Sequence, residues 1–298
     1  MELKFNRLKP GWNWLFTIIL SLVSLLMLLP MLLVIIVSFS SEASISEVGY
    51  SFFPIEWTLN GYGHLMKMGD QVAQSYIITI FYTIAGTVMS LTVMSMFSYV
   101  IALKHFPARR FLTWMMFFTM LFSGGLVPSY MMWTQTFHIR NTLWALLIPG
   151  LMMGAFNVIM MRTYFTQNIP DAVIEAARID GANEFRILYG IVLPMALPII
   201  ATIGMLVGLA YWNDWMNGLY YINDDNLYSI QVLLQKIQRN LDQLRQQAQG
   251  GGNMNAAELP STAVRMALTV MGVLPIMVIY PFVQKWFVQG IAIGAVKG

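Results

Sequence analysis

One short segment of the sequence gathers side chains that are suited to bind a polar ligand: Tyr211, Trp212, Asn213, Asp214, Trp215 and Asn217. Aromatic rings pack against the C–H faces of a sugar, while amide and carboxylate groups hydrogen-bond its hydroxyls. Asp214 directly follows the long apolar run 187–213, and an ionisable residue within or near a membrane span usually faces a protein interior or a cavity. The segment therefore predicts contact with a sugar along a path through the protein.

Two other interpretations of this segment remain open. Trp and Tyr are enriched where a membrane meets water, so the aromatic residues also fit an interfacial belt. The amides and the carboxylate also fit a polar network that packs helices together, including helices of a partner subunit.

The sequence lacks the motifs of the common enzymes. It has no Cys, so disulfides, thiolate metal sites and cysteine nucleophiles are absent. It also has no G-x-x-x-x-G-K-[ST] phosphate loop, no H-E-x-x-H and no G-x-S-x-G. The three His residues are scattered. We therefore expect no catalytic residue, metal site or cofactor in this chain, and an intramembrane enzyme is excluded.

The composition is that of an integral membrane protein. Of the 298 residues, 57% are hydrophobic and 10% are charged, whereas soluble domains carry about 25% charged residues. The mean hydropathy is +0.63. A net charge of +3 is too small and too scattered to indicate a nucleic-acid partner. Lipid is therefore the expected surrounding of most of the chain.

Six apolar runs are long enough to cross a bilayer, which takes about 20 helical residues. They are 10–41, 71–103, 111–139, 141–161, 187–213 and 266–284. The runs are continuously apolar instead of alternating, which favours helices over a β-barrel. The first run is too long for a signal peptide and is expected to stay as a span. The predicted fold is an all-α polytopic membrane protein with six transmembrane helices.

The distribution of positive charge predicts the orientation. Lys and Arg are more frequent in the connections on the side of the N-terminus, and this side is normally cytoplasmic. Both termini are therefore expected in the cytoplasm, and the inverted topology is disfavoured. We divide the chain into an N-terminal part (1–70), a five-helix core (71–288) and a cytoplasmic tail (289–298).

One cytoplasmic connection, 168–194, has the pattern of two short helices. Pro170 suits the first helical position, Gly181 supplies a break, and Asn183 suits the cap of a second helix. An apolar stripe then recurs at helical spacing, formed by Phe185, Leu188, Tyr189 and Val192. By composition alone, this segment is equally a linker folded back on the protein or a docking element.

The spacing within this connection resembles the EAA signature of ABC importer permeases. Three residues separate Glu175-Ala176-Ala177 from Gly181, and nine more separate Gly181 from Ile191, which leads to Leu193-Pro194. Four further segments are similar to carbohydrate permeases of the lipo-oligosaccharide and aldouronate uptake systems, and to the maltose permease subunits. They are 122–128, 141–149, 156–157 and 290–298.

The resemblance implies a type I ABC importer permease in a bacterial cell membrane. The 168–194 connection would then be a coupling hairpin that inserts into a partner ATPase, with Glu175, Ala176, Ala177, Arg178, Asp180, Gly181, Ile191, Leu193 and Pro194 as coupling residues. ATP and Mg²⁺ would bind to an ATPase dimer. The other implied partners are a second permease, forming a heterodimer, and an extracellular solute-binding protein that delivers a sugar for alternating access. A non-sugar solute and, from another class, a passive channel are the alternatives.

Two further features permit more than one interpretation. The outer loop 222–264 contains an amphipathic helix (Ile230, Leu234, Ile237, Leu241, Leu244), which is expected either to meet a binding protein or partner permease, or to cover the chain's own outer face. Gly124 and Gly125 interrupt the third run. They either open the helix near a pathway or allow close helix packing, and we favour packing.

Overall fold

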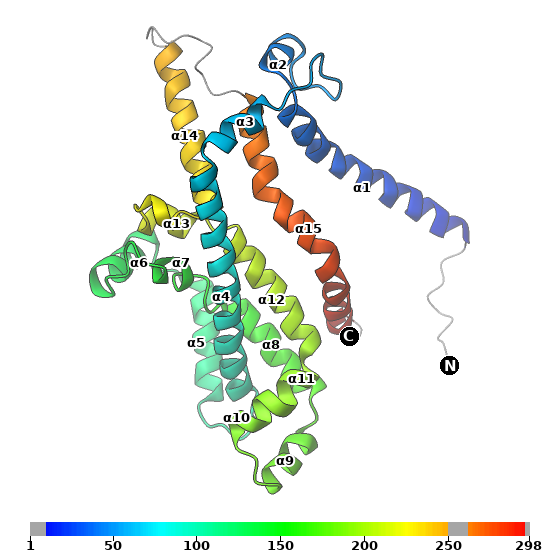
Figure 1. The fold of residues 1–298 in the computed structure, drawn as a ribbon. Coiled ribbons are helices and arrows are strands. Elements are labelled where there is room, and N and C mark those ends of the chain that lie inside the picture. Colours follow the sequence, from blue (N-terminus) through cyan, green and yellow to red (C-terminus); the bar gives the residue numbers. More distant parts are fainter. Residues whose placement is uncertain (1–9, 250–261, 296–298) are drawn as a thin grey trace. The chain divides into compact units, whose positions relative to one another are not determined.

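The computed structural model describes residues 10–249 and 262–295, and every named element in these ranges is a helix (Figure 1). The described residues form two compact units. The first unit takes residues from Met1–Gly69 and Ile237–Leu274, and the second takes residues from Asp70–Lys236 and Pro275–Gly298. The basic residues before Pro10, the segment 250–261 and the last three residues of the predicted tail lie outside the described residues.

The first unit begins with a long apolar helix, α1 (Pro10–Ser38), which confirms the first predicted span. The most apolar 18-residue window of its 28-residue span has a mean hydropathy of 2.9, and none of that window is buried within the chain. A helix that is apolar on all sides is stable only against lipid or another protein. The exposed side chains of α1 therefore mark a surface that water does not cover.

Two short helices, α2 (Glu42–Val48) and α3 (Asn60–Lys67), follow α1 and contact the start of α15 (Thr262–Ala295). The backbone N–H of Ala263 donates a hydrogen bond of 2.9 Å to Oε1 of Glu42. A carboxylate at a helix N-terminus interacts favourably with the helix dipole. A Cβ atom at Gly61 would lie 3.1 Å from the Ala263 backbone, so α3 and α15 pack closely.

The second unit is organised around α4 (Gly69–Ala102), which confirms the second predicted span. Its buried face repeats at intervals of three or four residues and consists largely of small or hydroxyl-bearing side chains. The buried residues are Val72, Ser75, Thr79, Tyr82, Gly86, Ser90, Met94, Ser95, Ser98, Tyr99 and Ile101. Small residues let neighbouring helix backbones approach closely in a membrane, and hydroxyls can bond across helices.

The other elements of the second unit are mostly short. They are α5 (Arg109–Leu121), α6 (Leu126–Met131), η2 (Met132–Thr136), α7 (Trp144–Leu147), α8 (Ala155–Asn168), α9 (Asp171–Ile179), α10 (Glu184–Ile187), η3 (Leu188–Val192), α11 (Leu193–Met195), α12 (Leu197–Trp212), α13 (Met216–Tyr221) and η4 (Asp225–Leu227). The first residues of α14 (Ile230–Gln249) and the last part of α15 complete it.

The third predicted span is broken. The segments Arg109–Leu121 and Leu126–Thr136 meet at an angle of 116°. Gly125 has a φ of +84°, a conformation that residues with a Cβ rarely adopt. A Cβ at Gly124 would meet no atom within 4 Å, and one at Gly125 only Pro128 at 4.0 Å. The close-packing interpretation of these glycines is therefore wrong within this chain, because their role is to break the helix.

The fourth predicted span differs most from the structure. The helix of residues 141–161 is not continuous, because α7 ends at Leu147 and α8 begins only at Ala155. The carbonyl of Leu147 accepts a 2.7 Å hydrogen bond from the Tyr211 hydroxyl, and the carbonyl of Leu151 accepts a 3.5 Å bond from Ser90. Irregular backbone at membrane depth is tolerated where protein buries it and satisfies its polar groups.

The count of six spans is not confirmed. Within the described residues, three helices are long and apolar enough to cross a membrane, or five if each of two bent pairs counts as one span. The fifth predicted span begins too early, because an 86° bend separates Glu184–Met195 from Leu197–Trp212. The sixth is confirmed by Thr262–Pro281.

Tyr211 joins α12 to α4 and to the broken fourth segment. Its side chain is fully buried, and its hydroxyl lies 3.1 Å from the Ser90 hydroxyl as well as bonding Leu147. The ring lies directly over Gly86, where a Cβ atom would be 2.5 Å from the ring carbon Cζ. Only glycine at position 86 leaves room for this arrangement.

We expect Gly86→Ala to lower the free energy of unfolding by about 1–3 kcal/mol, because the added methyl displaces the Tyr211 ring and its hydrogen bonds. The measurement is unfolding of the purified protein in mixed detergent micelles. Gly190→Ala is the matched control, since a Cβ there meets no atom within 4 Å. Equal stability of the two variants would contradict the proposed packing.

Candidate functional site

The connection 168–194, called the hairpin below, folds as the sequence predicts around a glycine corner. Helix α9 begins at Asp171, one residue after Pro170, and ends at Ile179. Gly181 has a φ of +81°, and the following N–H of Ala182 bonds the Ala177 carbonyl at 3.0 Å. This bonding satisfies a free carbonyl at the helix end and requires the left-handed backbone that glycine adopts readily. Figure 1 shows α9 at one end of the second unit.

The second half of the hairpin is a continuous helical stretch from Glu184 to Met195. Asn183 caps its start, since the Asn183 side chain accepts a 2.8 Å hydrogen bond from the Arg186 N–H. The predicted apolar stripe is only half right. Leu188 and Val192 are buried, whereas Phe185 is 62% exposed and Tyr189 is 47% exposed.

The two alanines of the EAA-like string differ in exposure. Ala177 is buried against the chain's own core, and Ile174, Ala182, Ile191 and Leu193 pack beside that core. Ala176 is exposed, and the apolar side chain of Ile179 at the end of α9 is 86% exposed. One face of α9 therefore holds the hairpin on the second unit, while the opposite face is left uncovered by the chain.

A carboxylate network closes the corner of the hairpin. Nε of Arg178 donates a 2.9 Å hydrogen bond to Oε1 of Glu184, so the last turn of α9 is tied to the first turn of α10. This bond raises the pKa of the Arg178 guanidinium above its usual value. The hydroxyl of Tyr99, near the end of α4, donates to the other carboxylate oxygen, Oε2.

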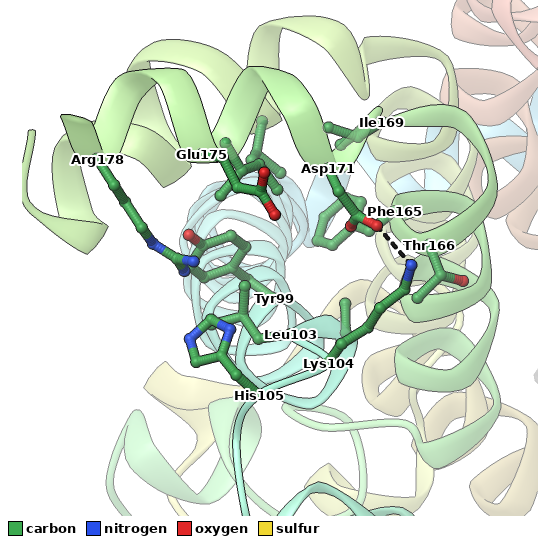
Figure 2. Close-up of a pocket in the computed structure, with 13 residues that line it drawn as sticks. Tyr99, Leu103, Lys104, His105, Phe165, Thr166, Ile169, Asp171, Glu175 and Arg178 are labelled. Atoms are coloured by element: carbon green, nitrogen blue, oxygen red, sulfur yellow. Dashed lines mark hydrogen bonds and ion pairs between the residues drawn. The ribbon is translucent and has the colours of Figure 1, made fainter. Parts of the chain in front are cut away.

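A cavity of about 100 Å³ lies between α9 and the end of α4 (Figure 2). Arg178 and Tyr99 lie at one end of it, and an ion pair between Lys104 and Asp171 lies at the other. Glu175 also lines the cavity. Polar contacts at the two ends of this space, together with the buried apolar core that includes Tyr99, Ala177 and Leu188, hold the hairpin against the end of α4.

The residues predicted to contact a sugar fall into two groups. Tyr211 and Trp212 are buried at the end of α12, where Tyr211 has the packing role described above. Asn213 and Trp215 are exposed, and Asp214 and Asn217 are partly exposed, in and just after the turn between α12 and α13. Their predicted contact with a ligand stays a prediction, and the burial of Tyr211 assigns it to support of this turn.

Asp214 organises that turn with one of its two carboxylate oxygens. Oδ1 accepts hydrogen bonds from the backbone N–H of Met216 at 3.1 Å and of Asn217 at 3.2 Å. Oδ2 is buried and has no hydrogen-bond partner among the described residues. The Asn217 side chain donates to the Pro149 carbonyl at 2.9 Å, which ties the turn to the broken fourth segment. A buried carboxylate oxygen without a donor is costly, and it favours a role beyond local folding.

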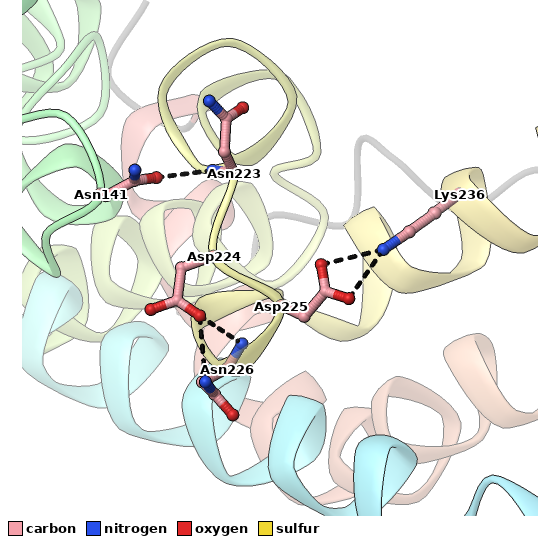
Figure 3. Close-up of polar contacts among 6 residues, drawn as sticks. All are labelled: Asn141, Asn223, Asp224, Asp225, Asn226 and Lys236. Atoms are coloured by element: carbon pink, nitrogen blue, oxygen red, sulfur yellow. Dashed lines mark hydrogen bonds and ion pairs between the residues drawn. The ribbon is translucent and has the colours of Figure 1, made fainter.

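The start of the predicted outer loop is held to the second unit (Figure 3). The Asn141 side chain accepts a 2.6 Å hydrogen bond from the Asn223 N–H, and Asp225 is paired with Lys236 at 2.9 Å. That pairing lowers the pKa of Asp225 and raises the pKa of Lys236. Ile230, the first residue of the amphipathic helix, is buried and its N–H bonds Thr79 of α4.

The covering interpretation of the outer loop therefore applies to the beginning of α14. The side chains of Leu241 and Leu244 lie outside the described residues, so the docking interpretation of the rest of the loop stays open.

Sequence analysis missed the part that Tyr99 plays. The tyrosine lies in an apolar run far from the hairpin in the sequence, and nothing in its local pattern distinguishes it from the other aromatic residues. Glu184 was not among the predicted coupling residues. One feature of the sequence could have indicated this role: Tyr99 lies at the end of a span, where its hydroxyl can reach the charged residues of a connection.

Comparison with known proteins identifies the family. The family model described as "Binding-protein-dependent transport system inner membrane component" matches residues 85–293. The chain is 33% identical over 275 residues to the polygalacturonan/rhamnogalacturonan transport system permease protein YtcP of Bacillus subtilis (strain 168). The matched region covers 92% of this chain and 94% of that protein. It is 34% identical over 271 residues to protein LplC of the same organism, covering 91% and 90%.

A solved structure has the same fold. It is the crystal structure of a bacterial ABC transporter involved in the import of the acidic polysaccharide alginate. The similarity has a TM-score of 0.78 at 29% identity and covers 94% of this chain and 99% of that chain. Together with the broken apolar helices and the hairpin, these similarities show that the chain belongs to the family of binding-protein-dependent transport system inner membrane components, the multi-pass permeases of ABC transporters.

Proposed function

We propose that this permease forms half of the membrane channel of an ATP-driven importer that takes up a sugar or oligosaccharide. The observation that carries the proposal is the hairpin, whose α9 buries Ala177 in its own core while it leaves Ala176 and Ile179 uncovered. An exposed apolar side chain at the tip of a rigid helix suits insertion into the pocket of a partner.

The partner at the hairpin is proposed to be a dimer of ATP-binding subunits, which holds the ATP and Mg²⁺. This assignment makes the hairpin cytoplasmic, with both termini on the same side of the membrane. A second permease would complete the channel as a heterodimer, and an extracellular solute-binding protein would deliver the substrate. The family to which the chain belongs is described as binding-protein-dependent, which supports the last of these partners.

The proposed mechanism is alternating access driven through the hairpin. ATP closes the ATPase dimer and moves α9, and the two permeases then open outward to receive the sugar. Hydrolysis reverses the movement and opens the path inward. The continuous stretch Glu184–Met195 would carry the displacement to α12 across the 86° bend, as a rigid-body shift of one packed element against another.

Two observations support a carbohydrate substrate. The names of two similar proteins mention the polysaccharides polygalacturonan, rhamnogalacturonan and alginate. The turn after α12 also carries the exposed side chains of Asn213 and Trp215 beside the partly exposed Asp214, which suits hydroxyl groups and a sugar ring.

The direct test is uptake by the reconstituted complex. The chain is co-purified with the subunits that accompany it, placed in proteoliposomes, and offered labelled oligogalacturonides, alginate oligosaccharides, neutral oligosaccharides and amino acids. We expect uptake of a saccharide that requires both ATP and the binding protein. Uptake without ATP would favour a passive channel, and uptake of amino acids alone would favour another class of importer.

Ile179→Asp should weaken ATPase docking by about tenfold without unfolding the permease, because it places a charge at the centre of the proposed apolar contact. The measurement is the affinity of the purified ATPase subunit for the permease in detergent. Ile55→Asp serves as the control, since Ile55 is also exposed, at 61%, but lies in the first unit. Equal affinities of the two variants would remove Ile179 from the docking surface.

Asp214→Asn should reduce saccharide uptake by about tenfold, because it removes the charge that strengthens hydrogen bonds to hydroxyl donors. The amide oxygen can still accept the hydrogen bonds from Met216 and Asn217, so the turn is expected to keep its shape. Uptake is measured together with binding of the ATPase subunit, which should not change. Unaltered uptake by this variant would assign Asp214 to folding alone.

A further inference from the structure

We infer that Tyr99 and Glu184 are positioning residues that connect the hairpin to α4, as a second mechanical link beside the covalent connection to α12. The inference rests on the proposed function, because it assigns a role in transmitting force from an ATPase. It adds a route that the fixed positions of the EAA-like string do not describe, since Tyr99 lies outside the string and Glu184 occupies one of its variable positions.

The link is the carboxylate of Glu184, which joins its own helix to two others. Glu184 begins α10, Arg178 lies in the last turn of α9, and Tyr99 lies in the last turn of α4. Oε1 of Glu184 accepts the hydrogen bond from Arg178, and Oε2 accepts the one from Tyr99. Hydrogen bonds to a charged acceptor are stronger and more directional than those between neutral groups. The corner of the hairpin and the end of α4 are therefore held in one geometry.

The tyrosine side of this link is rigid. Tyr99 is only 4% exposed and is part of the buried core around α4, α8 and the hairpin. A ring that is fixed by packing holds its hydroxyl in one place, so a displacement of Glu184 must either move α4 or break the hydrogen bond. A flexible surface partner would absorb the same displacement by changing its rotamer.

The other polar contact beside the cavity is weaker, and it joins Asp171 of the hairpin to Lys104, two residues beyond the end of α4. The side chains of Lys104 and Asp171 are 72% and 59% exposed, and an ion pair so open to water contributes little free energy. The cavity of about 100 Å³ lies between this ion pair and Tyr99, so direct packing of α9 on α4 is incomplete there. Among the described contacts, the Tyr99–Glu184 bond is therefore the main polar attachment of the hairpin corner to α4.

Helix α4 continues from this attachment to the turn that holds Asp214. The Tyr82 hydroxyl on α4 donates a 2.8 Å hydrogen bond to the Tyr211 carbonyl, and Ser90 on α4 contacts the Tyr211 hydroxyl. The Asp214 N–H bonds the same Tyr211 carbonyl at 3.0 Å. Helix α4 thus hydrogen-bonds the hairpin near one end and the base of the proposed substrate turn further along, and a rigid helix with such contacts is able to carry coupling energy between them.

The test compares Tyr99→Phe with Tyr164→Phe in the reconstituted complex. Tyr164 is partly buried on α8, and its hydroxyl makes no hydrogen bond among the described residues, so the control removes an oxygen atom without removing a contact. We expect Tyr99→Phe to lower the saccharide taken up per ATP hydrolysed by about fivefold while ATPase binding stays normal. The Tyr164→Phe ratio should equal that of the wild type.

Two further variants separate transmission from simple stability. Glu184→Ala should lower the ratio as well, and adding Tyr99→Phe to it should cause no further loss, because the two residues act through one bond. Glu184→Gln keeps an oxygen that accepts the Tyr99 hydrogen bond and should recover part of the ratio.

The possible failures are distinguishable. If the wild-type complex shows no ATP-dependent saccharide uptake, the proposed function is wrong. If the wild type transports, and Tyr99→Phe keeps the wild-type ratio of uptake to hydrolysis, only the link through α4 is wrong. Additive losses from the Tyr99 and Glu184 changes would likewise contradict a shared bond.

Discussion

The constraint on which the second unit depends is that buried backbone groups in apolar surroundings need hydrogen-bond partners. The helical breaks after Leu147 and before Ala155 free carbonyl groups that no helix satisfies. Hydroxyl groups from Tyr211 and Ser90 take over that task. The small buried face of α4 follows from the same need, since glycine and serine at its surface let these side chains and backbones come close enough to bond.

This arrangement explains how an irregular chain is able to stay folded in apolar surroundings, as the proposed transport role requires. Unbroken helices would satisfy their own backbones, but they would offer no turn in which polar side chains face a ligand. The breaks create turns, and the one between α12 and α13 holds Asp214, whose oxygen Oδ2 is buried without a hydrogen-bond partner among the described residues. The free-energy cost of the breaks is offset by the hydroxyl groups of Tyr211 on α12 and Ser90 on α4, and these two helices therefore contribute both to stability and to the geometry of the proposed substrate turn.

The hairpin follows a different rule, because it must be rigid on one side and open on the other. Ala177 and the Gly181 corner attach α9 to its own chain, while Ile179 stays exposed. The sequence indicated the corner, the helix cap and the spacing correctly. It was wrong for the apolar stripe, because periodicity at Phe185 and Tyr189 describes one side of a helix without saying whether this chain or another protein covers it.

The sequence by itself determined the class of the protein and the local geometry of the hairpin. Low charge, long apolar runs and the positions of Gly181 and Asn183 act through solvation and backbone sterics, which depend on neighbours in the sequence. Only the tertiary structure decided that the third, fourth and fifth runs bend or break, that Tyr211 packs on Gly86, and that Tyr99 meets Glu184. An apolar composition is equally compatible with a straight helix and with a broken one. Which of the two forms depends on hydrogen-bond partners that come from distant parts of the chain.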